Sequence, residues 1–354
     1  MKKLYYILLL VAFYSCKDLS DEVKLAQNIQ QLTHHSEDIS TVKISEDGNT
    51  IYYTIHKNKS STDNGDSDLY SINSDGSNNK KILTYPANTG IEPIISKNGK
   101  LLAFTSYKNT STGGQAELVV GNIDGTNLRT FFIHNGSLPV YAFVDNDNSI
   151  LYGKSMRLSN CECNTIWKRN LEGSENIKIS NDNNAVVADV SDENNLILVD
   201  TYLSAYSMNY LGRDTIQLGT GFTPRRISPL NSSFLLSKDM LAASSTPSTR
   251  NYFKQVFVVD TNGANLRQLT NSDMNNYPVD YFPDGQQVLF LADKNGRNEN
   301  ERELYSIKLD GSGLKRLTAN DYYEEAYGFL EKSKKVLFTS RKDGYNNLYV
   351  LNLN

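Results

Sequence analysis

Acidic, amide and aromatic side chains gather in three short segments of this 354-residue chain. The segments read HHSED (34–38), NSDMNNY (271–277) and NDYYEE (320–325). Carboxylates, amides and tyrosine rings bind a cationic peptide segment or a sugar through charge pairing, hydrogen bonds and ring stacking. For any one of these residues, a solvated loop position is the simpler interpretation. As a group they predict a binding rim made of His34, Glu37, Asp38, Asp273, Asn276, Tyr277, Asp321, Tyr323, Glu324 and Glu325.

The sequence contains none of the short motifs that carry hydrolytic or zinc chemistry. Neither G-x-S-x-G nor H-E-x-x-H occurs in it. The adjacent His34 and His35 would point to opposite faces of a strand, which disfavours a shared metal ion. We therefore predict no catalytic residues and no metal ligands, and we favour a role without enzymatic activity.

Two further clusters have ligand chemistry of their own. The segment STDNGDSD (61–68) contains Asp63, Asp66 and Asp68, whose oxygens suit calcium. Their spacing does not follow the EF-hand pattern, so a solvated loop is the favoured interpretation and calcium is the only cofactor left open. Cys161 and Cys163 flank a single glutamate, and in an oxidising compartment they could form a small disulfide or bind a soft metal.

The first residues are typical of a targeting segment. Lys2 and Lys3 precede an apolar run at 4–13, which is shorter than the roughly 20 residues that span a bilayer. Ser15 and Cys16 follow, and the segment resembles a bacterial lipoprotein signal, in which the cysteine is acylated and becomes the new N-terminus. We predict a signal peptide at 1–15, an anchor and linker at 16–27, and one domain at 28–354.

Composition limits the class of partner. The chain is 21% charged and 39% hydrophobic with a formal net charge of −4, which is ordinary for a soluble domain and excludes a basic surface for nucleic acid. Its 22 tyrosines and many Asp-Gly and Asn-Gly pairs favour strands joined by tight hairpins.

One repeat organises the chain and positions the clusters described above. Four segments align without gaps on a Leu-Thr pair, at 32–48, 83–99, 269–285 and 317–333. Each is followed by an apolar run, a polar loop and a third strand that ends in a tight turn. The turn glycines recur about every 40–50 residues, the period of a four-stranded propeller blade; they are Gly76, Gly125, Gly173, Gly212, Gly263 and Gly311. We predict an all-β, seven-bladed propeller rather than six or eight blades, with units starting near 38, 90, 137, 184, 221, 274 and 322.

The seventh unit supplies only three strands. The segment NIQQLT (28–33) resembles the fourth strands of the other units, so we predict that it pairs with NLYVLNLN (347–354) and closes the ring. Closure removes exposed strand edges. The alternative is a three-stranded last blade with a disordered N-terminal segment.

The repeat resembles that of TolB-type β-propellers, which also occurs in the propellers of prolyl oligopeptidase relatives. The segment 281–318 carries all its hallmarks: a P-D-G turn, an N-x-x-x-L-Y entry to the third strand, a D-G turn and a final Leu-Thr. The resemblance implies a non-catalytic module that binds an envelope protein or peptide. The chain differs from TolB because no α/β domain precedes its ring and because seven blades are counted instead of six. The alternative is a glycan-binding or lyase-type propeller that acts on carbohydrate.

The predicted location is the Gram-negative cell envelope. A monomeric ring would be held at the outer membrane through lipidated Cys16 and would face the periplasm or the cell surface. Lys17, rather than an aspartate, follows the cysteine, so the inner-membrane retention signal is missing.

Loop lengths select one face of the ring. Turns between first and second strands and between third and fourth strands are tight, whereas the second-to-third connections at 56–67, 107–115, 154–163, 238–253 and 293–302 are long. Long loops on a rigid scaffold usually carry function, so we place the site on their face. Arg225 and Arg226 open a first strand; they could line the channel, although an ion pair with a neighbouring blade is the simpler role.

Overall fold

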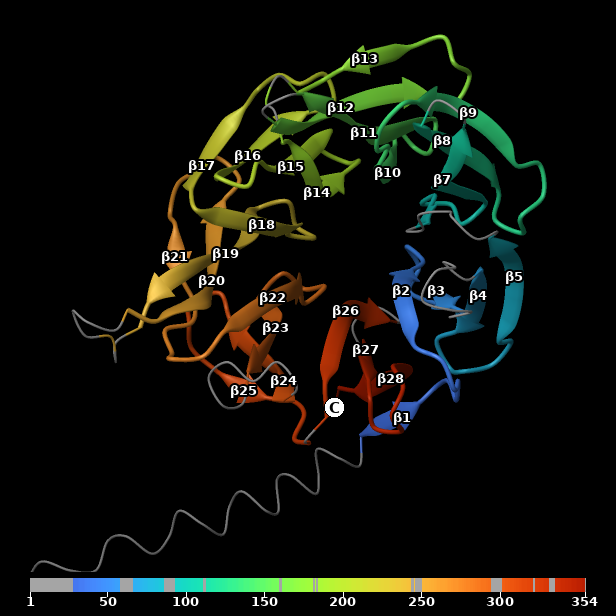
Figure 1. The fold of residues 1–354 in the computed structure, drawn as a ribbon. Coiled ribbons are helices and arrows are strands. Elements are labelled where there is room, and N and C mark those ends of the chain that lie inside the picture. The colour runs from blue at the N-terminus through green and yellow to red at the C-terminus, as the bar shows by residue number, and fades with distance from the viewer. Residues whose placement is uncertain are drawn as a thin grey trace, which may run out of the picture.

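The computed structural model describes residues 28–57, 66–85, 93–110, 113–158, 161–180, 182, 184–242, 245, 250–293, 301–320, 322–330 and 335–353. Seven four-stranded antiparallel sheets are arranged as blades around a central channel (Figure 1). The predicted seven-bladed, all-β propeller is confirmed. Among the described residues there is no helix long and apolar enough to cross a membrane.

Blades 1 to 4 each run from an innermost to an outermost strand in chain order. Blade 1 contains β2 (Ile39–Ile44), β3 (Thr50–His56), β4 (Ser67–Asn73) and β5 (Lys80–Tyr85). Blade 2 contains β6 (Ile94–Ile95), β7 (Leu101–Thr110), β8 (Gly113–Asn122) and β9 (Arg129–His134). Blade 3 contains β10 (Val140–Val144), β11 (Ser149–Leu158), β12 (Cys161–Asn170) and β13 (Asn176–Lys178). Blade 4 contains β14 (Val186–Ser191), β15 (Leu196–Asp200), β16 (Ser204–Asn209) and β17 (Ile216–Thr220).

Blades 5 to 7 continue the same order around the ring. Blade 5 contains β18 (Phe222–Ile227), β19 (Ser233–Leu241), β20 (Tyr252–Asp260) and β21 (Arg267–Gln268). Blade 6 contains β22 (Asn276–Tyr281), β23 (Gln287–Asp293), β24 (Arg302–Lys308) and β25 (Lys315–Arg316). Blade 7 contains β26 (Glu324–Leu330), β27 (Lys335–Ser340) and β28 (Asn347–Asn352), with β1 (Ile29–Gln31) as its outermost strand.

The first and last described strands meet in blade 7, as predicted. β1 pairs with β28 in antiparallel register, with Ile29 opposite Leu351. The buried amide of Asn347 fixes the chain where it leaves β1: its Oδ1 accepts from Thr33 Oγ1 at 2.9 Å and from the His35 backbone at 2.8 Å. The outer edge of β28 is therefore paired at this junction.

Apolar side chains fill the spaces between blades. The middle strands are buried on both faces because each blade lies between two others; β27, for example, buries Val336, Leu337 and Phe338 in succession. Leu337 packs in the cluster shared with blade 1, whereas Val336 and Phe338 pack in the cluster shared with blade 6. Each such side chain stabilises the fold by roughly 1.5–3 kcal/mol on full burial, so the core is a ring of inter-blade layers.

The Leu-Thr signature of the repeat has a structural cause. In blade 5 the hydroxyl of Thr270 accepts a hydrogen bond from the Val256 backbone and donates one to Gln255 Oε1, both at 2.9 Å. In blade 6 Thr318 accepts from the Leu304 backbone at 2.8 Å in the same way. The threonine thus ties the end of the fourth strand to the start of the third, where buried polar groups need partners.

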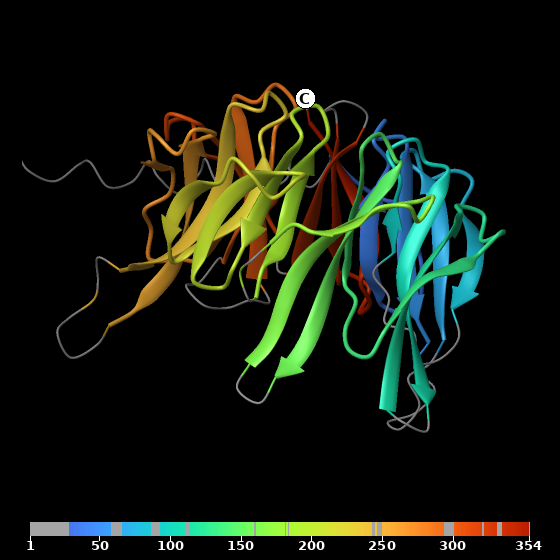
Figure 2. The ribbon, with the colours of Figure 1, turned by 90° about the horizontal axis from the view of Figure 1, so that it is seen from above.

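We call the side of the ring that carries the second-to-third connections the loop face and the opposite side the turn face. Figure 2 shows the hairpins β7–β8, β11–β12 and β19–β20 projecting from the loop face. Two of the segments predicted as loops, 107–115 and 154–163, are largely paired strand: β7 and β8 remain in register to Thr110 opposite Gly113. Backbone hydrogen bonds continue the ladder beyond the blade, which the polar composition of these segments did not reveal.

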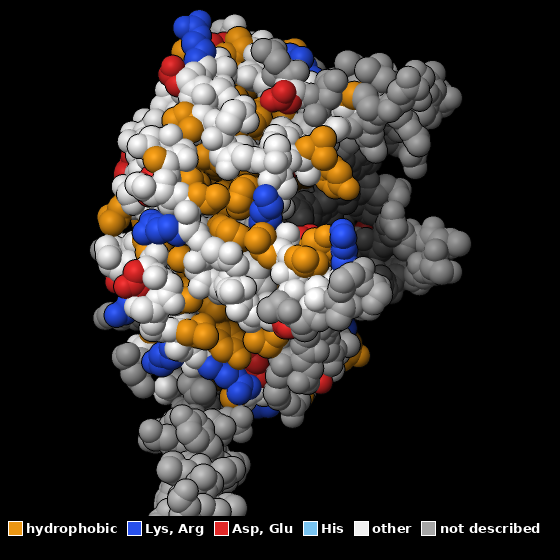
Figure 3. All heavy atoms as spheres, turned by 90° about the vertical axis from the view of Figure 1, so that its left-hand side faces the viewer, with side chains coloured by type: hydrophobic (Ala, Val, Ile, Leu, Met, Phe, Trp, Pro, Cys, Tyr) orange, Lys and Arg blue, Asp and Glu red, His pale blue; other side chains and the backbone are white. Residues whose placement is uncertain are grey.

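The outer wall of the ring is mixed in character. Over β17 and β21, apolar side chains lie in patches between Lys, Arg, Asp and Glu (Figure 3). Apolar side chains dispersed in this way are normal for a protein surface, which leaves the two mouths of the channel as the candidate sites.

Candidate binding site at the channel mouth

A pocket of about 270 Å³ opens at the loop-face mouth of the channel, between blades 5, 6 and 7. We call it the mouth pocket. Its charged and aromatic lining consists of Arg225, Lys254, Tyr277, Arg302 and Glu325. Two of these, Tyr277 and Glu325, belong to the rim predicted from sequence. Pro224 and Pro278 contribute apolar wall; they are tolerated because β18 and β22 are the innermost edges of their sheets.

Arg302 fixes the position of Tyr277 in this pocket. Its guanidinium lies 4.2 Å from the centroid of the Tyr277 ring and 5.7 Å from that of Tyr323. Arg302 Nε also pairs with Asp293 Oδ1 at 3.2 Å, and that carboxylate is fully buried. A cation stacked on an aromatic face and held from behind by a buried carboxylate gives the pocket one rigid wall.

The channel beneath this pocket contains opposed charges from four blades. Arg226 Nε lies 3.9 Å from Asp280 Oδ1 on blade 6, so the predicted ion pair with a neighbouring blade is confirmed for Arg226. Asp189 of blade 4 accepts a hydrogen bond from the Ile227 backbone at 2.8 Å. Burial raises the pKa of Asp280 to about 6 and also raises the pKa of Asp189. Burial and the adjacent Arg226 lower the pKa of Arg225.

Two predicted rim residues are not on the surface. Asn276 is buried, and its Nδ2 donates to the Met274 carbonyl at 2.8 Å and to Gln255 Oε1 at 3.1 Å. Glu324 is also buried, and it accepts from Thr318 Oγ1 at 2.8 Å and from Asn320 Nδ2 at 2.5 Å. These side chains complete the polar links between blades, so they are not placed to contact a ligand.

Glu324 also has a buried carboxylate neighbour, Glu303. Burial, reinforced by the negative charge of Glu303, raises the pKa of Glu324 to about 8. Glu303 accepts from Arg316 Nη2 at 3.0 Å and from the Asn320 backbone at 2.7 Å. The pair lies between blades 6 and 7 and belongs to the framework of the ring.

The other predicted rim residues are dispersed over the loop face. Asp38 accepts from the Asn346 backbone at 2.7 Å and from Arg341 at 3.2 Å, which holds the β27–β28 connection against the start of blade 1. His34, Glu37 and Asp273 are exposed and do not line the mouth pocket. Tyr323 does not line the pocket, and its ring centroid lies 5.7 Å from the Arg302 guanidinium. Asp321 lies outside the described residues.

The structure describes only some of the residues in the predicted aspartate and cysteine clusters. Asp68 is buried and pairs with Lys57 at 2.7 Å and with Lys81 at 3.6 Å, two ammonium groups that disfavour calcium beside it. Asp63 and Cys16 lie outside the described residues, and the backbone carbonyl of Asp66 accepts from the Lys57 N–H at 2.9 Å. For this segment a solvated loop stays the prediction, with calcium as its alternative. Cys163 is disulfide-bonded. Within the described part of the chain, no group of three His, Cys, Asp or Glu side chains could hold a metal ion.

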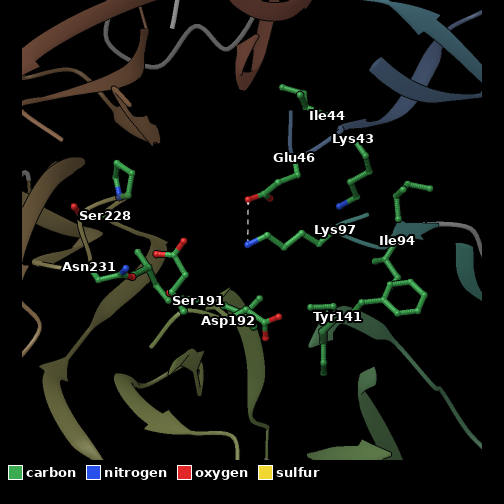
Figure 4. Close-up of a pocket in the computed structure, with 17 residues that line it drawn as sticks. Lys43, Ile44, Glu46, Ile94, Lys97, Tyr141, Ser191, Asp192, Ser228 and Asn231 are labelled. Carbon is green, nitrogen blue, oxygen red and sulfur yellow. Dashed lines mark ion pairs between the residues drawn. The ribbon is translucent and has the colours of Figure 1, made fainter. Parts of the chain in front are cut away.

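A second pocket, of about 440 Å³, lies at the turn-face mouth (Figure 4). Lys43, Glu46 and Lys97 point into it, and Lys97 Nζ pairs with Glu46 at 3.4 Å across blades 1 and 2. Asp192, on its border, accepts from the backbones of Asp145 and Asn146 at 2.9 and 2.8 Å. Charged groups at this mouth thus connect the turns of neighbouring blades. Because these groups already have a structural role, we favour the loop-face mouth as the functional site.

Lys254 and Arg302 were missed by the analysis of the sequence. They enter the mouth pocket from β20 and β24, the third strands of their blades. The sequence prediction used the connections between blades, and these two residues lie outside them. The pairing register of a third strand within its blade decides which of its side chains reaches the mouth.

No family model matches this chain, and no curated protein matches it. Solved structures do. An oligogalacturonate lyase in complex with manganese matches with a TM-score of 0.63 and 13% identity, over 92% of this chain and 93% of that chain. The β-propeller domain of the Trilobed protease from Pyrococcus furiosus matches with a TM-score of 0.61 and 13% identity, over 90% and 96%. TolB from Acinetobacter baumannii matches with a TM-score of 0.45 and 14% identity, over 88% and 78%.

At sequence identities this low, the similarity to these structures shows the fold alone. At that level they agree with the seven-bladed β-propeller seen in the structure. The archaeal domain is described as having an open velcro topology, whereas β1 and β28 close the last blade here. Propellers host unrelated functions, so the function has to be argued from the mouth pocket.

Proposed function

We propose that this protein is a non-catalytic envelope lipoprotein whose propeller binds a segment of a protein partner at the loop-face mouth of the channel. The observation that supports this most strongly is the mouth pocket itself. It combines the Tyr277 ring, which stacks with the Arg302 guanidinium, with the apolar Pro224 and Pro278. Charged groups of both signs from three blades complete it. A rigid aromatic anchor in a concave pocket with a polar rim is the usual centre of a protein interface.

The scaffold suits binding without a large rearrangement. The pocket walls belong to strands whose backbones are fixed by pairing within each blade, such as Tyr277 opposite Leu291. A site built on paired strands is formed before the ligand arrives, which lowers the entropy cost of association. The loop-face hairpins β7–β8, β11–β12 and β19–β20 add further contact surface around the mouth.

Affinity capture of the tagged, full-length protein from its native envelope after mild cross-linking tests the proposal. We expect a stoichiometric envelope protein, whose recovery falls when Tyr277→Ala removes the aromatic wall. Tyr345→Ala is the matched control, because Tyr345 is an exposed tyrosine in the β27–β28 connection on the same face. Equal recovery from both variants would contradict a role for the pocket.

The membrane anchor is proposed from the sequence around Cys16. Metabolic labelling with a palmitate analogue should mark the native chain and leave Cys16→Ser unlabelled. Proteinase treatment of intact cells then separates the two orientations: digestion indicates surface display, and protection indicates a ring that faces the periplasm. A labelled Cys16→Ser chain would contradict the anchor.

The second candidate is a glycan-binding or glycan-cleaving propeller. It is favoured by the presence of both Arg225 and Tyr277 in the pocket lining, since a guanidinium and a ring suit an acidic sugar. An oligogalacturonate lyase has a similar fold, and its name gives an acidic sugar as the substrate class for this candidate. A glycan panel probed with and without divalent metal distinguishes the candidates: sugar binding together with an empty protein capture would favour this one.

A further inference from the structure

We propose that the mouth pocket recognises acidic peptide segments, with Arg225 as the group that receives a carboxylate. The inference rests on the proposed function and adds the chemistry of the partner. It reverses the expectation of a cationic ligand that the acidic sequence of the rim suggested.

A β-bulge places two consecutive arginines on the same side of their strand. Side chains at positions i and i+1 normally point to opposite faces. The pairing of β18 with β19 shifts between Pro224 and Arg226, so Arg225 is the extra residue of a bulge. Both Arg225 and Arg226 consequently line the channel. The same shift occurs in β22 and β26, so the innermost strands share this distortion around the mouth.

The two arginines differ in their partners. Arg226 pairs with Asp280, and the other basic side chains of the mouth pocket also have carboxylates: Arg302 pairs with Asp293, and Lys254 pairs with Asp239 at 3.3 Å. The guanidinium of Arg225 has no hydrogen-bond or ion-pair partner among the described residues. It is the cation in this pocket that can bind an incoming group without losing an existing ion pair.

The charge of the pocket lining favours an anion. Three of its four charged side chains are cationic, Arg225, Lys254 and Arg302, and the fourth is Glu325. Asp239 and Asp293 offset the charges of Lys254 and Arg302 from outside the lining, so Arg225 is the cation of the lining without an ion pair among the described residues. A concave site with an excess of one charge attracts the opposite charge during association, and a planar guanidinium matches both oxygens of a carboxylate.

The walls select a peptide over a sugar. The rest of the lining is mainly apolar, because Thr223 and Ser237 add only two hydroxyls to the walls made of Pro224, Pro278, Val279, Leu291 and Ala326. Sugar hydroxyls need many hydrogen-bonding partners, whereas the stem of a glutamate and its neighbouring residues are accommodated by apolar walls. Arg225, Glu325 and Ala326 also border a second section of the channel, of about 560 Å³, which leaves depth for an extended segment.

The test measures binding of acetylated, amidated hexapeptides that contain glutamate, with matched glutamine peptides, to the full-length protein in detergent. We expect the glutamate peptides to bind more tightly and Arg225→Gln to weaken them at least tenfold, while the glutamine peptides change little. Arg213→Gln is the control, because Arg213 is exposed on a turn of blade 4 on the opposite face. An unchanged melting temperature shows that Arg225→Gln folds.

Each remaining outcome decides between the two proposals. Equal binding of glutamate and glutamine peptides overturns the acidic-peptide inference. Undiminished capture of a protein partner by Arg225→Gln also overturns it and leaves the proposed function standing. Binding of a galacturonate trimer that Arg225→Gln abolishes, with no peptide binding, overturns the peptide assignment and the proposed function together.

Discussion

Arg226 Nε lies 3.9 Å from Asp280 Oδ1 across the boundary between blades 5 and 6. The pair faces the channel beside Arg225, and Asp189 and Glu325 contribute further negative charge from blades 4 and 7. Gly328 on blade 7 keeps this space open, since a Cβ there would meet Asp280 Oδ2 at 2.9 Å. The ionisation of Asp280 therefore controls how strongly the two arginines attract an incoming anion.

Binding of an acidic peptide should tighten as the pH falls from about 7.5 to 5.5. The pKa of Asp280 is raised to about 6 by burial, so the carboxylate takes up a proton in this range, and the channel loses a negative charge. Asp189, whose pKa is also raised, acts in the same direction. Peptide glutamates remain largely ionised above their ordinary pKa of about 4.3. Fluorescence anisotropy at constant ionic strength measures the change, and Asp280→Asn should flatten it; an identical pH dependence in that variant would contradict the assignment.

The stability of the ring should decline between about pH 4.5 and 8 through Glu324. Its pKa is raised from 4.5 to about 8 by burial and by Glu303, so the folded state holds a proton that the unfolded chain has released. The stabilisation is complete below the unfolded pKa and is lost as the pH rises through the folded pKa, with a loss on the order of 5 kcal/mol. Thermal unfolding across this range should show a shallower decline for Glu324→Gln, whereas Glu325→Gln, next to it on the surface, keeps the native slope.

Asn347→Ala should destabilise the closed ring. The side chain is buried and satisfies Thr33 Oγ1, the His35 N–H and the His35 carbonyl. Its removal leaves these groups without partners at the junction of the two chain ends, at a cost of roughly 2–4 kcal/mol. Urea unfolding measures the loss. Gln30→Ala, an exposed position on β1, is the control, and equal midpoints for the two variants would show that the amide does not secure the junction.

Gly212→Ala and Gly99→Ala form a matched pair that tests contact between blades. Both glycines have positive φ, of 71° and 68°, so an added Cβ costs about 1 kcal/mol of backbone strain at either position. At Gly99 the Cβ meets nothing within 4 Å, but at Gly212 it would lie 2.1 Å from the Ile179 carbonyl of blade 3. We expect Gly212→Ala to lose at least about 2 kcal/mol more in denaturant unfolding. Similar losses would mean that the turn can move away from blade 3.

Much of the fold could be predicted from the sequence because the repeat is local. A blade is a run of four consecutive strands, and its Leu-Thr and Asp-Gly signals come from contacts within that run, such as Thr270 with Gln255. Seven units and the pairing of 28–33 with the last strand followed from these signals. The hairpin extensions of β7 and β11 did not, since a polar composition does not distinguish a paired strand from a loop.

The mouth pocket was only partly predictable, and the reasons are tertiary. Sequence identified Tyr277 and Glu325 because they lie in the connections 271–277 and 320–325 between blades. It could not show that the preceding residues, Asn276 and Glu324, turn into the framework, because burial depends on the partner blade. Lys254 and Arg302 reach the mouth from third strands, and the bulge at Arg225 exists only in the pairing of β18 with β19. The sequence alone determined a closed ring of seven blades, since that follows from short-range periodicity. Packing between blades decided which charges face the channel, because those side chains come from strands that meet only when the ring is closed.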